Sequence, residues 1–215
     1  MLKLVDVSFA FGKNQLLHHL DLQLLPGEAV WLQGPNASGK TTLLNIIATI
    51  IPRFIHGNFS GQVFWQDTNL HELNFPQIAT VLGFLRQHPQ QQLFFPKVEQ
   101  ELAFGPENLR KPAEEILATM EEVCNQLQIN SLLQVETAKL SFGQKKLVAL
   151  AANLMLKAPI LLLDEPAVGI STNNLHLIKQ VLLKEKERGK ILVIADHLPV
   201  WYDLADRILP MSELR

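Results

Sequence analysis

Short stretches in which apolar and polar residues alternate dominate the first part of the chain. Four of them fit β-strands: residues 2–8, about 20–25, 29–33 and 61–67. The run TTLLNIIATI (41–50) predicts a buried helix that stops ahead of Pro52. A further strand is expected over 80–86, leading into the polar loop QHPQQQ. The first sixty-five residues are therefore expected to be rich in β-structure.

From about Glu99 to Leu156 the spacing of apolar residues becomes helical. In the segment PAEEILATMEEVCNQL, four apolar side chains fall on one helical face: Ile116, Met120, Val123 and Leu127. The acidic residues fall on the opposite face, where a solvated surface is the simplest interpretation. We therefore expect a helical subdomain over about 88–156, inserted into the rest of the domain.

Two apolar runs, ILLLD (160–164) and KILVIAD (190–196), are short and uninterrupted, which is typical of strands buried on both faces of a parallel sheet. A predicted helix over 173–188, closed by Gly189, separates them. Strands that alternate with helices predict an α/β fold with a mostly parallel sheet.

Composition narrows the function classes. The chain has 215 residues, a net charge of −2 and 47% hydrophobic residues, so a surface built mainly to bind nucleic acid is not expected. The single cysteine, Cys124, excludes an internal disulfide, fits a reducing compartment and is expected to be buried. Neither a signal-peptide run nor an apolar run long enough to span a bilayer is apparent, so we expect no membrane crossing by this chain itself.

A phosphate-binding pattern, Gly-x-x-x-x-Gly-Lys-Thr, occupies residues 34–41 between an apolar strand and an apolar helix. Glycines let backbone N–H groups curl around phosphates, and a helix N-terminus adds partial positive charge. Lys40 is suited to reach the terminal phosphates, and the Thr41 hydroxyl can hold Mg²⁺. The predicted binding residues are Gly34, Asn36, Ala37, Ser38, Gly39, Lys40, Thr41 and Thr42.

The sequence ILLLDEP supplies two carboxylates at the end of a buried strand. Asp164 is placed to hold Mg²⁺ through its water shell. Glu165 follows directly and is placed to accept a proton from an attacking water. We therefore predict a phosphoryl-transfer site with Asp164 as a metal residue and Glu165 as a catalytic residue.

The segment LSFGQKK (140–146) has the spacing of a helix start. Ser141 and Gln144 are separated as in a capping box, and the apolar run LVALAANLML continues the helix. The first amides of such a helix form a second anion site.

LSFGQKK lies just upstream of ILLLDEP. With the phosphate loop, this arrangement resembles the ATP-binding-cassette (ABC) ATPases along nearly the whole chain. The resemblance implies a single 1–215 domain with a P-loop core, an N-terminal antiparallel β part and an inserted helical subdomain. It implies ATP and Mg²⁺ as cofactors. Phe11 would stack on adenine, Gln87 would link Mg²⁺ and the attacking water, and His197 would contact the γ-phosphate. Ser141, Gly143 and Gln144 would contact the ATP held by a second subunit.

The stretch FLRQHPQQQLFFPKVEQELAFGPENL is similar to the glutamine-loop region of energy-coupling-factor and cobalt/nickel-type importers. In that group this region docks helices of a membrane subunit. The resemblance therefore implies an ATPase subunit of a vitamin or metal-ion importer, with membrane subunits docking near 87–106. It would act as a dimer with itself or a paralogue, cytoplasmic and peripheral on the inner face of the cell membrane.

Three departures from the family pattern leave alternatives open. In the segment 140–146, the family signature, Phe142 replaces the first of two glycines and Gly143 retains the second. Close backbone approach to a phosphate depends on Gly143 more than on position 142 if the Phe142 side chain points away. Ser171 stands where an Asp is usual, and it either weakens communication across the dimer or only caps a helix. Either Asp196 or His197 stands at the position of the family's switch histidine, which contacts the γ-phosphate, and we expect His197.

Two rival functions follow from the same residues. One is a catalytically weak regulatory subunit paired with an active paralogue, which the altered Phe142 and Ser171 would suit. The other is a soluble non-transport ABC ATPase acting on ribosomes or DNA. Of the tryptophans, Trp31 is expected in the core, whereas Trp65 and Trp201 fit either the core or a partner-facing surface.

Overall fold

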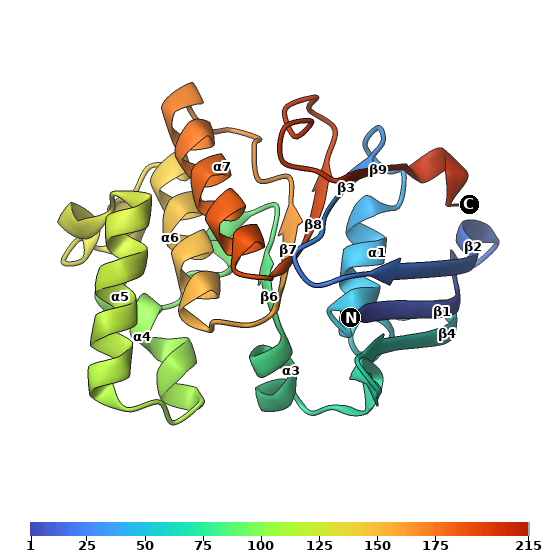
Figure 1. Ribbon diagram of the computed structural model, residues 1–215, viewed down its shortest axis with the longest axis horizontal. Coiled ribbons are helices and arrows are strands. Elements are labelled where there is room, and N and C mark those ends of the chain that lie inside the picture. The colour runs from blue at the N-terminus through green and yellow to red at the C-terminus, as the bar shows by residue number, and fades with distance from the viewer. Residues whose placement is uncertain (215) are drawn as a thin grey trace.

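Two β-sheets organise the computed structural model, which describes residues 1–214 (Figure 1). The smaller sheet is antiparallel with the strand order β2-β1-β4-β5. Its strands are β1 (Leu2–Phe11), β2 (Asn14–Leu24), β4 (Asn58–Trp65) and β5 (Thr68–Asn69). The N-terminal antiparallel part that the family resemblance implied is therefore confirmed.

The larger sheet has the order β6-β7-β8-β3-β9, and all its neighbouring strands are parallel. Its strands are β3 (Ala29–Gln33), β6 (Leu82–Leu85), β7 (Ile160–Asp164), β8 (Ile191–Asp196) and β9 (Arg207–Pro210). Every residue of β7 and β8 is buried. This burial explains why both strands read as uninterrupted apolar runs, and it confirms the predicted parallel sheet.

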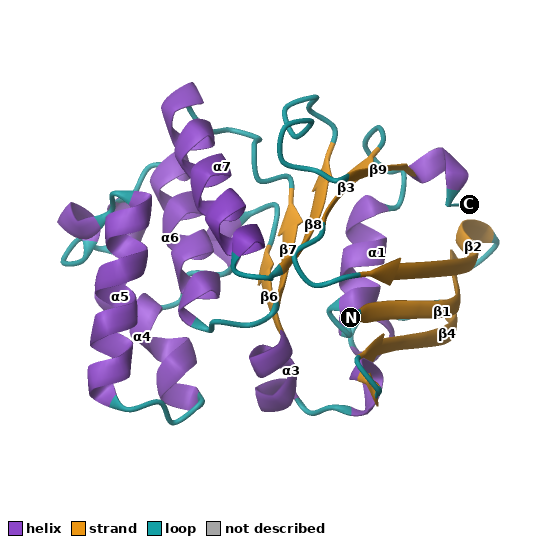
Figure 2. Cartoon of the chain, viewed as in Figure 1, coloured by secondary structure: helices purple, strands orange, loops and turns teal. Residues whose placement is uncertain are grey.

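Helices cover both faces of the parallel sheet, with α1 between the two sheets and α4, α5, α6 and α7 on the other side (Figures 1 and 2). The helices are α1 (Lys40–Ile47), α2 (Ile50–Arg53), α3 (Phe75–Val81), α4 (Val98–Asn108), α5 (Ala113–Leu127), α6 (Phe142–Met155) and α7 (Thr172–Glu187). Short 3₁₀ turns occupy Leu70–Glu72, Pro89–Gln91, Asn130–Leu132, Thr137–Lys139 and Met211–Glu213.

Successive residues of the central strand β7 pack into two different hydrophobic cores. Leu161 and Leu163 belong to the core shared with α4, α5, α6 and α7. Ile160 and Leu162 belong to the core shared with α1 and the antiparallel sheet. The alternation of side chains along a strand therefore separates a helical half from a β-rich half of one domain.

The expected strand over 80–86 is shorter than predicted, because residues 75–81 form helix α3. The side chain of Asn74 accepts a hydrogen bond from the backbone N–H of Gln77, and the Gln77 side chain accepts one from the N–H of Asn74. This capping box, followed by a proline in the first turn, starts a helix that the apolar pattern had concealed.

Several predicted boundaries also shift. Strand β2 begins before the predicted 20–25, strand β4 lies earlier than 61–67, and β9 was not predicted as a strand. Within the expected helical subdomain, the first long helix begins at Val98, next to the expected start at about Glu99.

The three tryptophans differ in their burial. Trp31 and Trp201 are both fully buried, and each indole donates a hydrogen bond to Asp196. Trp65 is partly buried against the core of the β-rich half. Trp201 is therefore a core residue.

None of the helices within residues 1–214 combines the length and the apolar character that crossing a bilayer requires.

The burial of Cys124 in α5 predicts an unreactive thiol. Its side chain is fully buried, and burial raises the pKa of the thiol to about 11. Because only the thiolate attacks a disulfide reagent, at about pH 8 roughly one thiol in a thousand is reactive. We expect no labelling by 5,5′-dithiobis(2-nitrobenzoic acid) of the native protein within minutes, and one equivalent after unfolding in urea. Absorbance at the thionitrobenzoate band measures both, and rapid native labelling would refute the packing of α5.

Candidate active site

The loop between β3 and α1 is tightly curled. Ala37 and Gly39 both adopt positive φ angles, of 62° and 100°. A Cβ atom on Gly34 would lie 2.7 Å from the Ser38 hydroxyl oxygen, so a side chain at this position would require Ser38 to shift. The loop therefore turns sharply into the N-terminus of α1, as a phosphate-binding loop requires.

Lys40 folds back over this loop. Its Nζ atom donates hydrogen bonds to the carbonyl oxygens of Gly34 (2.8 Å) and Pro35 (2.9 Å). Burial lowers the pKa of Lys40, and the carboxylates of Glu165, Asp164 and Asp196 offset part of that effect. The loop thus holds a cation against a group of carboxylates.

Asp164, the last residue of β7, lies beside the start of α1. Its carboxylate accepts a 3.0 Å hydrogen bond from the hydroxyl of Thr41 and is 2% exposed. Burial raises the pKa of Asp164 to about 6, while the Thr41 hydrogen bond acts in the opposite direction. A hydroxyl and a carboxylate oxygen at the mouth of a phosphate loop are the hard oxygen donors that Mg²⁺ prefers, so the two residues fit the metal role.

Two of the residues expected to be catalytic, Gln87 and His197, lie against the carboxylate of the third, Glu165. The side-chain amide of Gln87 donates to Oε2 of Glu165 at 2.7 Å. Nδ1 of His197 lies 3.5 Å from Oε1 of the same residue. Segments far apart in the sequence therefore bring Glu165, Gln87 and His197 together.

Asp196 and His197 have different environments. Asp196 is fully buried, and its carboxylate accepts hydrogen bonds from the backbone N–H groups of Ala167 and Leu198 and from the Trp201 indole. The side chain of His197 is 35% exposed and faces Glu165. This arrangement favours His197 for the switch position and gives Asp196 a structural task.

A cavity of about 460 Å³ gathers most of the predicted binding residues. Its lining consists of Phe11, Asn14, Leu16, Asn36, Ala37, Ser38, Gly39, Lys40, Thr41, Thr42, Gln87 and Glu165. Phe11 is 44% exposed, and its ring meets Phe9 edge-on. A half-exposed aromatic ring beside a phosphate loop suits stacking on a base.

Asn14 and Leu16 line the cavity but were not predicted. Asn14 is the antiparallel pairing partner of Phe11. The hairpin turn between β1 and β2 therefore brings Asn14 and Leu16 to the site beside Phe11. The available signal was the polar GKN turn directly after Phe11, which predicts that the chain reverses there.

The remaining predicted residues lie outside this cavity. Gly34 and His197 line an adjoining hollow. Ser141, Gly143 and Gln144 lie at the start of α6, where Gly143 approaches the Asn174 side chain of α7. The structure thus does not bring the α6 start to the phosphate loop of its own chain, in line with the expectation that it serves a second subunit.

The start of α6 has the predicted capping box. The hydroxyl of Ser141 accepts a hydrogen bond from the Gln144 N–H (3.3 Å), and the Gln144 side chain accepts one from the Ser141 N–H (2.9 Å). The Phe142 ring packs against Gly169, where a Cβ atom would lie 2.6 Å from it. The ring therefore covers the loop after β7.

Ser171 caps the N-terminus of α7, as one of its two interpretations predicted. Its hydroxyl accepts a hydrogen bond from the Asn174 N–H at the start of α7.

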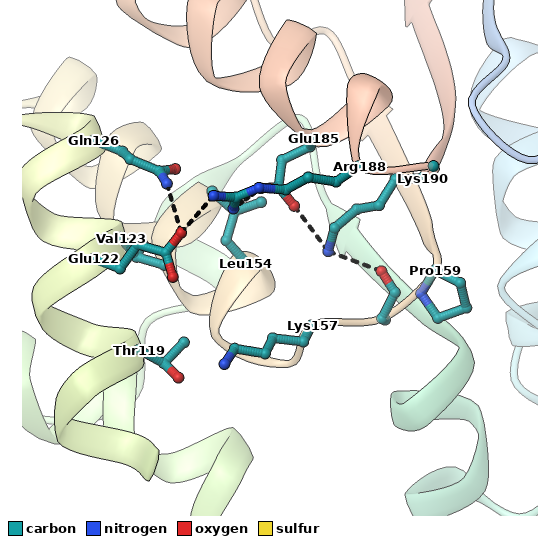
Figure 3. A pocket seen from close by; sticks show the side chains of 12 residues that line it. Thr119, Glu122, Val123, Gln126, Leu154, Lys157, Pro159, Glu185, Arg188 and Lys190 are labelled. Carbon is teal, nitrogen blue, oxygen red and sulfur yellow. Dashed lines mark hydrogen bonds and ion pairs between the residues drawn. The ribbon is translucent and has the colours of Figure 1, made fainter. Parts of the chain in front are cut away.

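A second cavity, of about 330 Å³, lies between α5 and the C-terminal ends of α6 and α7 (Figure 3). Four of its charged groups are paired with one another: Arg188 with Glu122 and Glu185, and Lys190 with Glu185 (Figure 3). It contains none of the predicted site residues. Because two of its cations are neutralised inside the protein, it is a poor match for a nucleotide.

Comparison with known proteins decides the family. The family model described as ABC transporter matches residues 17–168, which include the phosphate loop, the α6 start and Asp164–Glu165. The chain belongs to the ABC transporter family. The resemblance inferred from the motifs is confirmed, and the chain is an ABC ATPase domain.

Curated relatives of this ABC ATPase are also described as ABC transporter ATP-binding proteins. A provisionally named ABC transporter ATP-binding protein from Treponema denticola is 33% identical over 216 residues, covering 99% of this chain and 44% of the relative. The chain spans less than half the length of the first curated relatives it matches.

Solved structures share the fold of this ABC ATPase. The structure of cbiO1 from Clostridium perfringens, part of the ABC transporter complex cbiONQ, matches with a TM-score of 0.82 at 27% identity, covering 97% of this chain and 83% of that one. The cassette MJ0796, solved as a dimer bound to ADP and Pi, matches with a TM-score of 0.83 at 23% identity, covering 98% of this chain and 94% of that one.

The pKa of Asp164 predicts a pH-dependent stability difference from Asp164→Asn without nucleotide and Mg²⁺. Folding raises this pKa from 3.8 to about 6, so the folded state binds the extra proton in that window. The free energy of unfolding contributed by Asp164 therefore falls as the pH rises through the window. At about pH 7 we expect Asp164→Asn to be more stable than the wild type by on the order of 3 kcal/mol, and near about pH 4 equally stable. Urea unfolding measures this, and a difference independent of pH would contradict it.

Proposed function

We propose that the chain is the ATP-hydrolysing subunit of a membrane importer for a vitamin or a transition-metal ion, of the energy-coupling-factor type. The observation that carries the proposal is an apolar groove beside the Gln87 segment. The groove has a volume of about 430 Å³. It is lined by Phe75, Pro76, Ala79, Gln92, Leu93, Phe94, Glu101, Phe104, Gly105, Asn108, Leu109, Ala149, Ala152, Asn153 and Leu156.

Aromatic rings in this groove are exposed. Phe94 is 76% exposed, Phe75 is 52% exposed and Phe104 is 43% exposed. Exposed apolar clusters of this kind mark surfaces that another protein covers. The carboxylate of Glu101 accepts hydrogen bonds from the N–H groups of Phe94 and Phe95, which fixes the chain along the groove. A preformed apolar groove suits an amphipathic helix at the end of a membrane subunit.

The groove is linked to the ATP cavity through residues 84–92. The Gln92 side chain accepts a hydrogen bond from the Arg86 N–H and donates one to the Phe84 carbonyl. The next residue after Arg86, Gln87, donates to Glu165. A partner that moves in the groove would therefore shift a residue in contact with the carboxylate at the site of hydrolysis.

The residues in and beside the cavity support the following division of roles. Phe11 would stack on the adenine, and the loop with Lys40 would hold the phosphates. Mg²⁺, when bound by Thr41 and Asp164, would neutralise charge on the phosphate oxygens. Gln87 would orient the attacking water, and Glu165 would accept the proton of that water. His197 would contact the γ-phosphate.

A dimer would complete the site, with this chain pairing with itself or a paralogue. The start of α6 lies outside the cavity of its own chain, so Ser141, Gly143 and Gln144 would contact ATP bound by the other subunit. The similar protein cbiO1, which is part of the ABC transporter complex cbiONQ, supports a place in a transporter complex. We place the protein on the inner face of the cell membrane, with no nucleic-acid partner.

A regulatory subunit with weak hydrolysis, paired with an active paralogue, is the second candidate. It is favoured by Phe142, which occupies a signature glycine position, and by Ser171, whose hydroxyl is engaged as a helix cap. A purified homodimer that hydrolyses ATP at rates normal for the family would exclude this candidate.

Substitution of Glu165 tests the catalytic assignment. A glutamine has the same shape but accepts a proton far less readily, so Glu165→Gln should retain ATP binding and lose roughly 100-fold or more in hydrolysis. Lys40→Ala should lose nucleotide binding, because the phosphates lose their cation. Phosphate release and ATP binding measured on both variants distinguish the two roles. Normal turnover by Glu165→Gln would remove that residue from the mechanism.

The groove predicts which surface holds the membrane partner. Tagged wild-type protein, pulled down from gently solubilised membranes, should bring a polytopic membrane protein and a paralogous ATPase, identified by mass spectrometry. The double variant Phe94→Ala/Phe104→Ala should lose the membrane protein, because the exposed rings supply the apolar contact.

Leu117→Ala provides the matched control, since Leu117 is 65% exposed and does not line the groove. It should retain the partner. Recovery of wild-type protein with ribosomes or DNA would move the function to the non-transport alternative.

A further inference from the structure

A buried cation in α6 has no place in the reaction described above. Lys146 is fully buried, two residues after Gln144. Its Nζ atom donates hydrogen bonds to the backbone carbonyl oxygens of Glu165 and Val168, each at 2.7 Å. Burying an ammonium group is unfavourable unless the group is hydrogen-bonded, and these two hydrogen bonds offset that cost.

The partners of Lys146 belong to the loop after β7, which carries Glu165. Glu165 has a φ of 49°, a conformation that non-glycine residues rarely adopt. Its N–H donates to the Ala195 carbonyl at 2.7 Å, and its own carbonyl accepts from Lys146. Contacts on both sides of the residue therefore hold an unfavourable backbone conformation.

Phe142 covers this arrangement from outside. The Lys146 ammonium lies 5.2 Å from the centre of the Phe142 ring, within the range of a cation–π contact. The two residues are four apart in α6, which places them on one face of the helix. The same ring packs on Gly169, whose missing side chain leaves room for it.

We propose that Lys146, covered by Phe142, is a positioning residue that holds the 165–169 loop and thereby aims the Glu165 carboxylate. We call Lys146, Phe142 and Gly169 the loop clamp. The proposal rests on the proposed function only for the role of Glu165 in hydrolysis. It gives the aromatic at the altered signature position a task inside its own subunit.

Charge compensation supports the loop clamp. Burial lowers the pKa of Lys146 to about 8, and the carboxylates of Asp196, Glu165 and Asp164 act against that change. The ammonium therefore lies among the carboxylates at the end of the parallel sheet, and its two bonds reach the backbone of the loop directly.

Lys146→Met tests the loop clamp, because methionine has a similar length but no donor. We expect kcat for ATP hydrolysis to fall about tenfold, while KM and the Kd for ATP stay within about twofold. Amide hydrogen exchange in a peptide covering 165–171 should become faster. Phe142→Ala should also speed that exchange and lower kcat by a smaller factor, about threefold. A role confined to overall stability would leave the local exchange and the kcat-against-KM split unchanged.

Lys184→Met is the matched control, since it removes one positive charge from an exposed position of α7. It should leave kcat and the exchange at 165–171 unchanged. Wild-type kcat or wild-type exchange in folded Lys146→Met would overturn the loop clamp. Should Lys146→Met not fold, unchanged exchange in Phe142→Ala would overturn it instead. Absence of hydrolysis in the wild type would refute the proposed function, while the exchange data still decide whether the loop clamp exists.

Discussion

The parallel register of β3, β7 and β8 is the constraint on which the site depends. Asp164 pairs with Ala195, and Gln33 pairs with Asp196, so three strands end at the same edge of the sheet. The phosphate loop, the carboxylate pair and the switch segment each follow one of these strands. Ligand sites form at the carboxyl ends of parallel strands, because loops that are distant in sequence meet there.

Around that edge, buried charges are matched to one another and to backbone groups. Lys40 and Lys146 bond to carbonyl oxygens, while Asp164 and Asp196 accept from a hydroxyl, an indole and backbone N–H groups. Each ionised group is thereby paired with dipoles of fixed position. An electrostatic environment of this kind is set before any ligand arrives, which is what transfer of a charged phosphoryl group needs.

The sequence predicted those features that depend on local pattern. The parallel strands, the phosphate loop and the capping box at Ser141 each have a short-range signature, and all three appear in the structure. Helix α3 was missed because its start signal at Asn74 lies in a segment without helical apolar spacing. Asn14 and Leu16 reach the cavity through strand pairing.

The contacts of Lys146 and Phe142 could not be predicted for a related reason. Both residues lie on a helix, but what they touch belongs to the loop after β7, which is far along the chain from them. The direction of an aromatic ring at a signature position is decided by the room that Gly169 leaves, and no local pattern encodes that room.

The separation of the two cores by the side-chain alternation of β7 has an evolutionary consequence. Most residues that line the groove lie with the helical half, whereas α1 and the phosphate loop rest on the β-rich half. The groove residues of α3 are the exception, because Ile78 and Val81 of this helix pack into the β-rich core. A substitution that reshapes the packing under the helical side of the groove meets the other core only across the backbone of the sheet. Substitutions on the helical side of the groove can therefore accumulate with little change to the packing that supports the phosphate loop.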